Sequence, residues 1–174
     1  MTQPLSLDRN KTAVLIMDYQ NRQVSSLPGN FQPELLAKAN EVLAWARRVG
    51  IPVIYIEVRR GERTPETEIH PAVLPRDDEP VLTKRRVGPF STTNLDEVLK
   101  QKDIDTLVLM GISTSGCVLS TVRWAADIDY RCVVLSDCCA DRDDEVQRVL
   151  MEKVLLRQAS VVTSRELFQA LETA

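Results

Sequence analysis

One cysteine of the chain lies at a position that favours a reactive thiol over a side chain that only packs in the core. Cys117 lies one residue past a glycine in the segment GISTSGCVLS, residues 111–120, where an apolar run gives way to a helical pattern. At a helix start, unpaired backbone N–H groups and the helix dipole favour the thiolate, which can attack the carbonyl carbon of an amide. Asp18 and Lys84 also stand at the ends of apolar runs. We therefore expect these three residues to act together.

Short apolar runs alternate with helical periodicity along the chain. The runs that we interpret as buried strands are residues 12–18, 52–58, 81–84, 105–112, 131–136 and 160–163. The spacing of apolar residues predicts helices over residues 33–50, 94–102, 118–126 and 144–158, and a last helix after Thr163. The patterns Asn94-x-x-Glu97 and Thr163-x-x-Glu166 predict capping boxes. Residues 59–80 are polar and contain four prolines, so we expect a long irregular loop there.

Strands that alternate with helices predict right-handed βαβ crossovers and a parallel sheet covered on both faces. We therefore predict a single α/β domain over residues 1–174, a doubly wound sandwich with a six-stranded, mostly parallel sheet flanked by helices. In such sheets, ligands bind outside the carboxyl ends of the strands, near the point where the winding reverses. Asp18, Lys84 and Cys117 follow the first, third and fourth predicted strands. The predicted topology brings all three to one edge of the sheet.

Composition argues against several classes of function. The net charge of −3 does not favour a nucleic-acid or membrane-surface partner. The basic pairs at residues 47–48, 59–60 and 85–86 have acidic residues nearby, and we interpret most of them as solvated surface. The first strand is followed by neither G-x-G-x-x-G nor a phosphate-binding loop, and the chain contains no G-x-S-x-G motif. Dinucleotide binding and serine hydrolase chemistry therefore have no support.

Cysteine and histidine usage indicates the compartment and the cofactor content. The N-terminal residues lack the apolar core of a secretory signal, no apolar run approaches the ~20 residues of a membrane span, and no C-x-x-C pair occurs. We therefore expect reduced thiols and a cytoplasmic protein. Cys132, Cys138 and Cys139 are expected to be buried in the core or just behind the site. His70 is the only histidine. We expect it on a loop surface, and we predict neither a metal nor a cofactor.

Three segments carry a resemblance to a known family. AVLIMDYQN (13–21), TKRRVGPFSTTNLDEVL (83–99) and LVLMGISTSGCVLSTVRWAADIDY (107–130) occur in the order found in the isochorismatase-like cysteine hydrolases, and the likeness covers roughly residues 11–167. The resemblance implies a catalytic triad of Asp18, Lys84 and Cys117. It also implies a cis peptide bond between Ile112 and Ser113, with the backbone N–H groups of Ser113 and Cys117 directed at an oxyanion.

The resemblance also suggests residues around the substrate. Gln20, Phe90 and Thr114 are candidate substrate-binding residues, although Gln20 would equally suit a strand-end cap. Trp124 is as consistent with core or interface as with the pocket. Ser115 stands where family members often carry an acidic residue, which leaves recognition at that position open. Nicotinamidase-type members hold a metal with an Asp and two histidines after the second strand, and this chain lacks that set.

The chemistry implied is hydrolysis of a C–N bond in a small amide, carbamoyl or ureido compound, without a metal, through a Cys117 thioester. Asp18 would take the thiol proton and pass it to the leaving nitrogen, while Lys84 holds Asp18 ionised. Two alternatives stay open: an isochorismatase that cleaves a vinyl ether without a covalent cysteine, and a catalytically idle family member that serves binding or assembly. We expect a small-molecule substrate and a homo-oligomer, with no nucleic-acid or membrane partner.

Overall fold

The structure is a computed structural model that describes residues 5–172. Residues 1–4 and 173–174 of the predicted domain lie outside this range. The six strands are β1 (Thr12–Met17), β2 (Val53–Val58), β3 (Val81–Lys84), β4 (Thr106–Ile112), β5 (Arg131–Ala140) and β6 (Ala159–Val162). The α-helices are α1 (Asn21–Ser25), α2 (Gln32–Val49), α3 (Leu95–Gln101), α4 (Leu119–Asp127), α5 (Asp144–Val149) and α6 (Ser164–Glu172). None of these helices is long and apolar enough to cross a membrane.

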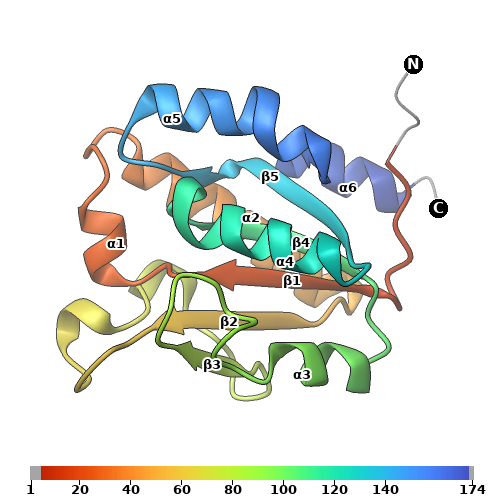
Figure 1. Ribbon diagram of the computed structural model, residues 1–174, viewed down its shortest axis with the longest axis horizontal. Helices are drawn as coiled ribbons and strands as arrows, with labels where there is room; N and C mark the ends of the chain where they lie inside the picture. Colours follow the sequence, from red (N-terminus) through yellow and green to blue (C-terminus); the bar gives the residue numbers. More distant parts are fainter. Residues whose placement is uncertain (1–4, 173–174) are drawn as a thin grey trace.

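All six strands form one sheet in the order β3-β2-β1-β4-β5-β6, and every neighbouring pair is parallel. The chain starts in the middle of the sheet at β1, builds outward to β3, and returns to place β4 on the other side of β1 (Figure 1). The winding therefore reverses between β1 and β4, which is where a ligand crevice is expected. The predicted doubly wound α/β sandwich is confirmed, with a sheet that is parallel throughout.

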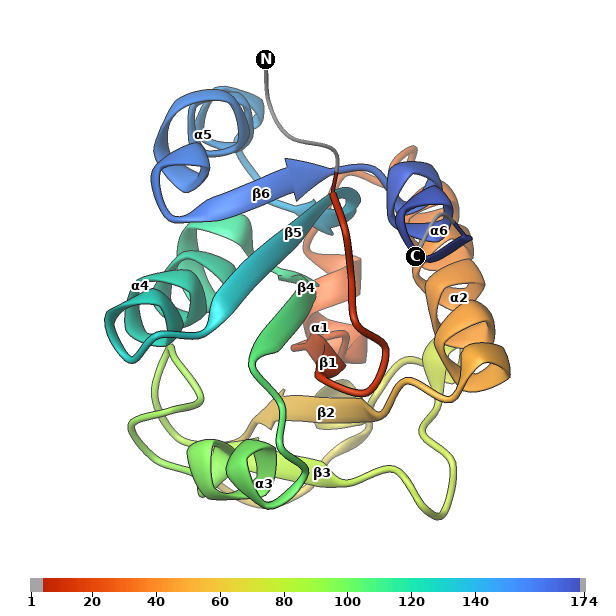
Figure 2. The same ribbon diagram turned by 90° about the vertical axis from the view of Figure 1, so that its right-hand side faces the viewer.

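Helices cover both faces of the sheet (Figure 2). Successive residues of a strand point to opposite faces, so each strand serves two cores. Val14 and Ile16 of β1 belong to the core under α2 and α6, whereas Leu15 and Met17 belong to the core under α3 and α4. All six residues of β1 are buried. Because the central strands are buried on both sides, their sequences are continuous apolar runs rather than an alternation of apolar and polar residues.

The structure differs from the sequence prediction at three helices. The run predicted as one helix over 144–158 is α5 followed by a wider π-helical turn, Leu150–Val154, and a 3-10 turn, Leu155–Arg157. Helix α1 was not predicted. The Asn94 capping box is wrong, because the Asn94 side chain makes no cap and the Thr93 hydroxyl instead accepts the N–H of Leu95.

The other predicted capping box is confirmed, and so is the loop. Glu166 accepts the backbone N–H of Thr163 at 2.7 Å, and Thr163 Oγ1 accepts that of Glu166 at 3.3 Å. Residues 59–80 contain only two short 3-10 turns, Pro65–Thr67 and Pro71–Val73. This loop lies at the carboxyl ends of β1 and β2, where Gln20 bridges to Ile69. The loop therefore frames one side of the crevice.

Candidate active site

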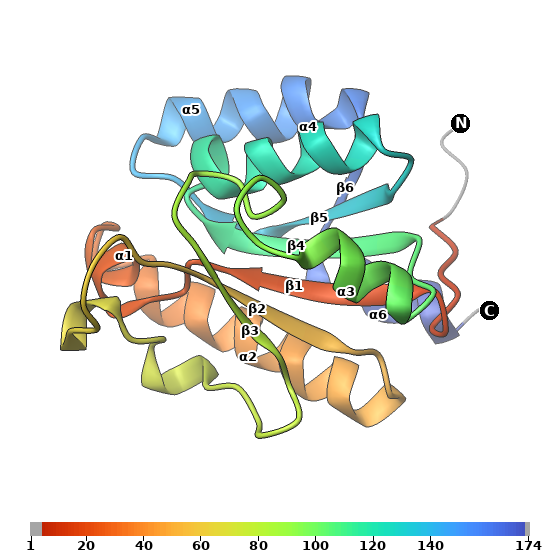
Figure 3. The same ribbon diagram turned by 60° about the horizontal axis from the view of Figure 1, so that its bottom comes forward.

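Asp18, Lys84 and Cys117 come together at the carboxyl edge of the sheet. Asp18 directly follows β1, Lys84 is the last residue of β3, and Cys117 lies in the π-helical turn Thr114–Val118 between β4 and α4. All three line one cavity of about 430 Å³. Figure 3 shows the carboxyl ends of these strands gathered on one side of the molecule. The topology thus unites residues that are distant in sequence, as predicted.

Lys84 is almost completely buried, at 1% exposure, and its ammonium is held from three directions. Nζ donates to Asp18 Oδ2 at 2.7 Å, to the Val87 carbonyl at 2.8 Å and to the Arg86 carbonyl at 3.3 Å. A buried charge is tolerated only when it is paired and hydrogen-bonded, and this one is both. Lys84 is therefore a fixed cation beside Asp18 rather than the solvated surface charge that its sequence position also allowed.

Asp18 is buried, and only one of its carboxylate oxygens has a partner. Oδ2 accepts from Lys84, while Oδ1 accepts no hydrogen bond from the described residues. Burial raises the pKa of Asp18 to about 6, although the Lys84 ammonium and the nearby Cys117 thiol lower it and Glu57 raises it further. Its backbone has a φ of 57°, in the left-handed region that non-glycine residues rarely adopt. The carboxylate is therefore ionised at neutral pH and has an oxygen free to accept a proton.

Cys117 is also buried, at 2% exposure. Burial and the Asp18 carboxylate raise its pKa well above the ordinary value, against the lowering effect of Lys84. The thiol lies 3.5 Å from the Ser113 carbonyl oxygen, to which it donates. The predicted resting thiolate is therefore wrong, because the sulfur lies within a π-helical turn, shielded from water and facing oxygen acceptors. At neutral pH the pair consists of a thiol beside a carboxylate.

Two glycines leave the space that the cysteine turn needs. A side chain at Gly111 of β4 would begin 3.0 Å from Cys117 Sγ and 3.1 Å from the Met17 carbonyl. At Gly116 it would begin 2.8 Å from Ser113 Oγ. Either contact is closer than real Cβ atoms comfortably allow. Gly111 thus allows the close approach of the cysteine turn to β1, and Gly116 leaves room for the Ser113 side chain within the turn.

The turn that carries Cys117 follows the predicted cis peptide bond. The peptide bond between Ile112 and Ser113 is cis. Asp141, just after β5, accepts the backbone N–H of Ser115 at 2.7 Å and so ties this turn to the neighbouring strand. Ser113 and Ser115 both line the cavity. Backbone N–H groups at the start of such a turn are suitable donors to a developing oxyanion.

Of the candidate substrate-binding residues, Gln20 and Thr114 are buried and Phe90 is partly exposed. Gln20 is 1% exposed, and its amide bonds both backbone groups of Val58 and the Thr67 carbonyl, so it positions the loop after β2. Thr114 is fully buried, with no hydrogen-bond partner for its hydroxyl. Phe90 stacks on Trp124, with the ring centroids 6.4 Å apart. None of the three lines the cavity. Their direct contact with substrate therefore stays a prediction.

Besides the predicted residues, the cavity is lined by residues that were not expected near substrate. They come from α1, from the loops after β2 and β3, and from the segment after β5: Gln23, Ser26, Val58, Arg60, Arg86, Val87, Asp141 and Arg142. Arg60 and Arg86 are exposed, as predicted for the basic pairs, yet they border the cavity. The same rule that located Asp18, namely position at the carboxyl end of a strand, would have located Arg60, Arg86 and Arg142.

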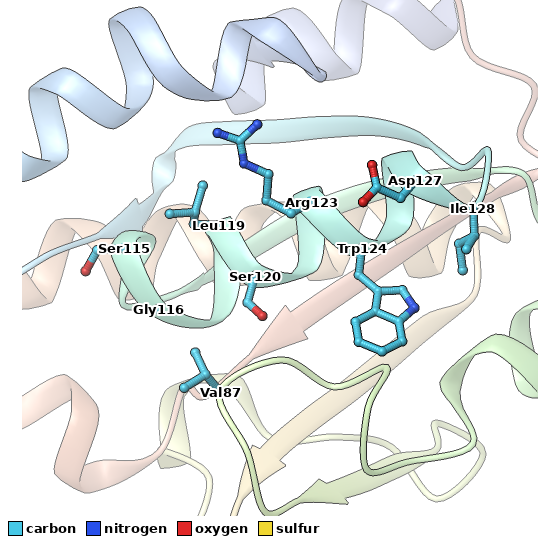
Figure 4. A pocket seen from close by; sticks show the side chains of 9 residues that line it. All are labelled: Val87, Ser115, Gly116, Leu119, Ser120, Arg123, Trp124, Asp127 and Ile128. Atoms are coloured by element: carbon cyan, nitrogen blue, oxygen red, sulfur yellow. The ribbon is translucent and has the colours of Figure 1, made fainter.

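A groove on α4 adjoins the cavity and shares Val87, Ser115 and Gly116 with it (Figure 4). Its volume is about 660 Å³, and Trp124 and Ile128 contribute apolar surface. Trp124 is 48% exposed, which removes the core alternative for this residue. Cys132, Cys138 and Cys139 are buried in the two cores, as predicted.

A second buried carboxylate lies next to the site on β2. Glu57 is 1% exposed; its Oε1 accepts from the Thr83 hydroxyl at 2.7 Å and pairs with Arg59 at 3.1 Å. Its Oε2 pairs with Arg63 at 3.6 Å. Within residues 5–172, no group of three or more His, Cys, Asp and Glu side chains is arranged to hold a metal ion. His70 lies in the loop, where its ring accepts the N–H of Ala72.

Comparison with known proteins gives consistent matches over most of the chain. A family model described as the isochorismatase domain matches residues 12–166. The chain is 25% identical over 185 residues to the maleamate amidohydrolase of Pseudomonas putida, covering 92% of this chain and 87% of that protein. It is 28% identical over 189 residues to the isochorismatase of Bacillus subtilis, covering 96% of this chain and 60% of that protein.

A solved structure agrees with these matches. The crystal structure of an N-carbamoylsarcosine amidase from Thermoplasma acidophilum superposes with a TM-score of 0.79 at 27% sequence identity, covering 88% of this chain and 96% of that one. The likeness therefore extends to the fold over most of the chain.

Proposed function

Because the chain belongs to the isochorismatase family of hydrolases, we propose that it is a metal-independent cysteine hydrolase of a small amide, carbamoyl or ureido compound. One observation carries this proposal. A buried carboxylate, Asp18, has a fixed cation on one oxygen and a free second oxygen, and it lies beside a buried thiol in a small cavity. The names of two similar proteins, a maleamate amidohydrolase and an N-carbamoylsarcosine amidase, support C–N bond cleavage.

The first half of the proposed reaction makes a thioester. Asp18 accepts the Cys117 proton while Sγ attacks the carbonyl carbon, so that the unfavourable thiolate forms only as the new bond does. The backbone N–H groups of Ser113 and Cys117 donate to the oxyanion, and each such donor contributes roughly 3–4 kcal/mol in comparable sites. Asp18 then gives the proton to the departing nitrogen, which leaves as ammonia or an amine.

The second half restores the enzyme. Water attacks the thioester carbon while Asp18 takes one of its protons, and the sulfur leaves as the acid product forms. The proton on Asp18 returns to Cys117, which balances the cycle. Lys84 stays charged throughout, holds the carboxylate in place and offsets its charge. No step requires a group that the chain does not supply.

The second candidate function is hydrolysis of a vinyl ether. One similar protein, from Bacillus subtilis, is named an isochorismatase. A carboxyl group with a pKa of about 6 can also protonate a carbon–carbon double bond. That reaction needs Asp18 but not the thiol. The two functions therefore make opposite predictions for a Cys117 variant, and an idle binding member predicts no turnover by any variant.

The deciding experiment measures ammonia release from a panel of small amides and ureides. Cys117→Ala should abolish release while the folded protein still binds substrate, and an acid quench of the wild type should trap an acyl group on Cys117. Cys132→Ala, which removes a buried sulfur outside the cavity, is the matched control and should keep its activity. Appreciable turnover by Cys117→Ala would refute the thioester and favour attack by water.

Metal independence is tested on the same assay. Exhaustive chelation should leave the rate unchanged, because Lys84 already provides the cation beside Asp18. Loss of activity that zinc or manganese restores would contradict this part of the proposal.

A further inference from the structure

Two aspartates just after β5 accept backbone N–H groups at the starts of helical segments. Asp143 accepts the N–H groups of Glu145 and Val146 at 2.9 and 3.0 Å and so caps α5, the helix that it precedes. Asp141 accepts the N–H of Ser115 at 2.7 Å, in the cysteine turn, which lies 26 residues away in sequence. The two carboxylates therefore make the same kind of contact with different segments, of which only one contains the proposed nucleophile.

The cysteine turn, Thr114–Val118, has no cap of its own. Ser113 occupies the N-cap position with an extended backbone, φ −98° and ψ 158°, but its side chain makes no capping hydrogen bond. An N-cap side chain normally accepts the N–H of the second or third helical residue. Ser115 is the second residue of the turn, so Asp141 takes the place of the missing cap from the end of the neighbouring strand.

Hydrogen bonds to the Ser113 carbonyl, at the start of the turn, are long. The N–H groups of Gly116 and Val118 donate to it at 3.2 and 3.4 Å. These distances exceed the roughly 2.9–3.0 Å that is typical of N–H···O bonds. The 2.7 Å bond to Asp141 is shorter and its acceptor is charged, which makes it the stronger contact. The position of the turn therefore depends on a residue outside it.

The sheet fixes where the Asp141 carboxylate lies. Ala140, the last residue of β5, is the register partner of Ile112, the last residue of β4, and Asp141 and Ser113 follow them directly. The second carboxylate oxygen of Asp141 accepts the N–H of Arg142 at 2.9 Å. Both oxygens thus bind backbone N–H groups, and Asp141 forms no ion pair within residues 5–172. A carboxylate held in this way is a fixed anchor on the wall of the cavity.

We propose that Asp141 is a positioning residue for the hydrolysis: through the Ser115 N–H it fixes the turn in which Cys117 and the proposed oxyanion donors lie. The inference rests on the proposed function for the reaction itself. Asp141 neither transfers a proton nor contacts the carbonyl carbon in this role. Loss of its carboxylate lets the turn shift, and the sulfur and the donors then no longer match the position of the carbonyl group. Asp143 provides the comparison, because its helix holds no proposed reacting group.

Alanine variants at positions 141 and 143 form a matched pair. Each removes one carboxylate cap from the same segment, so both should lower the thermal unfolding temperature by a similar few degrees. Turnover should separate them. Asp141→Ala should lower kcat by roughly 10²-fold, the effect of a ~1 Å misplacement at the reacting atoms. Asp143→Ala should keep the wild-type kcat, because Asp143 is exposed and does not line the cavity.

Three further readouts distinguish positioning from a loss of stability. KM should change much less than kcat in Asp141→Ala, because the oxyanion exists only in the transition state. The acid limb of the pH–rate profile should stay at the wild-type pH, because burial and Lys84 are the main influences on the pKa of Asp18. Asp141→Asn should restore most of kcat, since its side-chain oxygen accepts the same N–H.

A probe that needs no turnover measures the same arrangement. Isotopically labelled acetaldehyde adds reversibly to the thiol: Sγ bonds to the carbonyl carbon, the carbon–oxygen double bond becomes single, and the thiol proton passes to that oxygen. Carbon NMR detects the tetrahedral carbon of the adduct, which Cys117→Ala should lack. Asp141→Ala should raise the dissociation constant of the adduct roughly tenfold, because the donors no longer match its oxygen. Asp143→Ala should leave it unchanged.

The inference is overturned if Asp141→Ala keeps both the wild-type kcat and the wild-type dissociation constant. Equal losses in the two alanine variants, or a wild type that forms no adduct, would also overturn it. Failure of the proposed function looks different. If the wild type hydrolyses no amide but Asp141→Ala still weakens the adduct, the reaction is wrong and the positioning role stands. If amides are hydrolysed and Asp141→Ala changes nothing, the reaction stands and the positioning role is wrong.

Discussion

Asp18 and Glu57 are two buried carboxylates on adjacent strands, yet their surroundings differ. Glu57 has a partner on each oxygen, with Thr83 and Arg59 on one and Arg63 on the other. Asp18 has Lys84 on one oxygen, and its other oxygen accepts no hydrogen bond from residues 5–172. Burial raises the pKa of Asp18 to about 6. A fully satisfied carboxylate supports the structure, whereas one with a free oxygen beside a thiol can transfer a proton.

The largest effect that tests this contrast is expected from Asp18→Asn. The amide cannot accept the thiol proton, so kcat/KM should fall by about 10⁴-fold, the upper end for loss of a general acid–base. The circular dichroism spectrum should stay native. Glu57→Gln is the matched exchange on the next strand and should keep most of its activity. If both variants lost activity equally, the distinction between the two carboxylates would not hold.

Lys84→Met is the next largest change. It removes the cation that steadies Asp18, so we expect kcat to fall by about 10²-fold or more, in the range measured for single electrostatic groups. The loss of the Lys84 charge and hydrogen bond also raises the pKa of Asp18 above about 6. The acid limb of the pH–rate profile should therefore move to higher pH. If the rate of Lys84→Met fell but the acid limb of its pH–rate profile stayed at the wild-type pH, Lys84 would contribute only through packing.

The wild-type pH profile gives a third test. Asp18 must be ionised to accept the proton, and its pKa is raised to about 6. Below that value, kcat/KM should fall tenfold for each pH unit, and above it the rate should be level, because the Cys117 thiol keeps its proton well into the alkaline range. An acid limb near pH 4, the ordinary range for an aspartate, would contradict the burial argument.

Glu57→Gln gives the smallest effect, and it falls on stability. Arg59 and Arg63 lose a buried partner but are themselves partly solvated, so the free energy of unfolding should fall by only about 1–2 kcal/mol. Thermal unfolding should show a drop of a few degrees. Because the Glu57 charge raises the pKa of Asp18, its removal should also shift the acid limb slightly to lower pH. A shift to higher pH would have the wrong sign.

The sheet and the meeting of Asp18, Lys84 and Cys117 could be predicted because they depend on periodicity and on a topological rule. Apolar runs located six strands to within a few residues, and strand ends located the three side chains. Side-chain partners could not be predicted in the same way. Gln20 is held by the Thr67 carbonyl in a loop distant in sequence, and Thr114 is fully buried in the cysteine turn; neither placement follows from the residue type.

The resting state of Cys117 also lay beyond the sequence. A cysteine after glycine at a strand-to-helix junction favours a thiolate in general. Here a π-helical turn buries the sulfur beside a carboxylate, and burial together with Asp18 raises the pKa of the thiol more than Lys84 lowers it. Arg60 and Arg86 were interpreted as solvated surface, and they are exposed. Exposure does not exclude a place in the cavity lining, and only the structure shows that residues from three loops share one rim.

The strand order has a consequence for how the protein is assembled. Asp18 and Lys84 come from one half of the sheet, while Cys117 follows β4, which must insert against β1 to join the halves. The turn around Lys102 and Asp103 between α3 and β4 is exposed, so a break there separates the acid–base pair from the nucleophile. Neither piece contains a complete site. The proposed catalysis thus depends on the association of the two halves, and the appearance of activity would report that association directly.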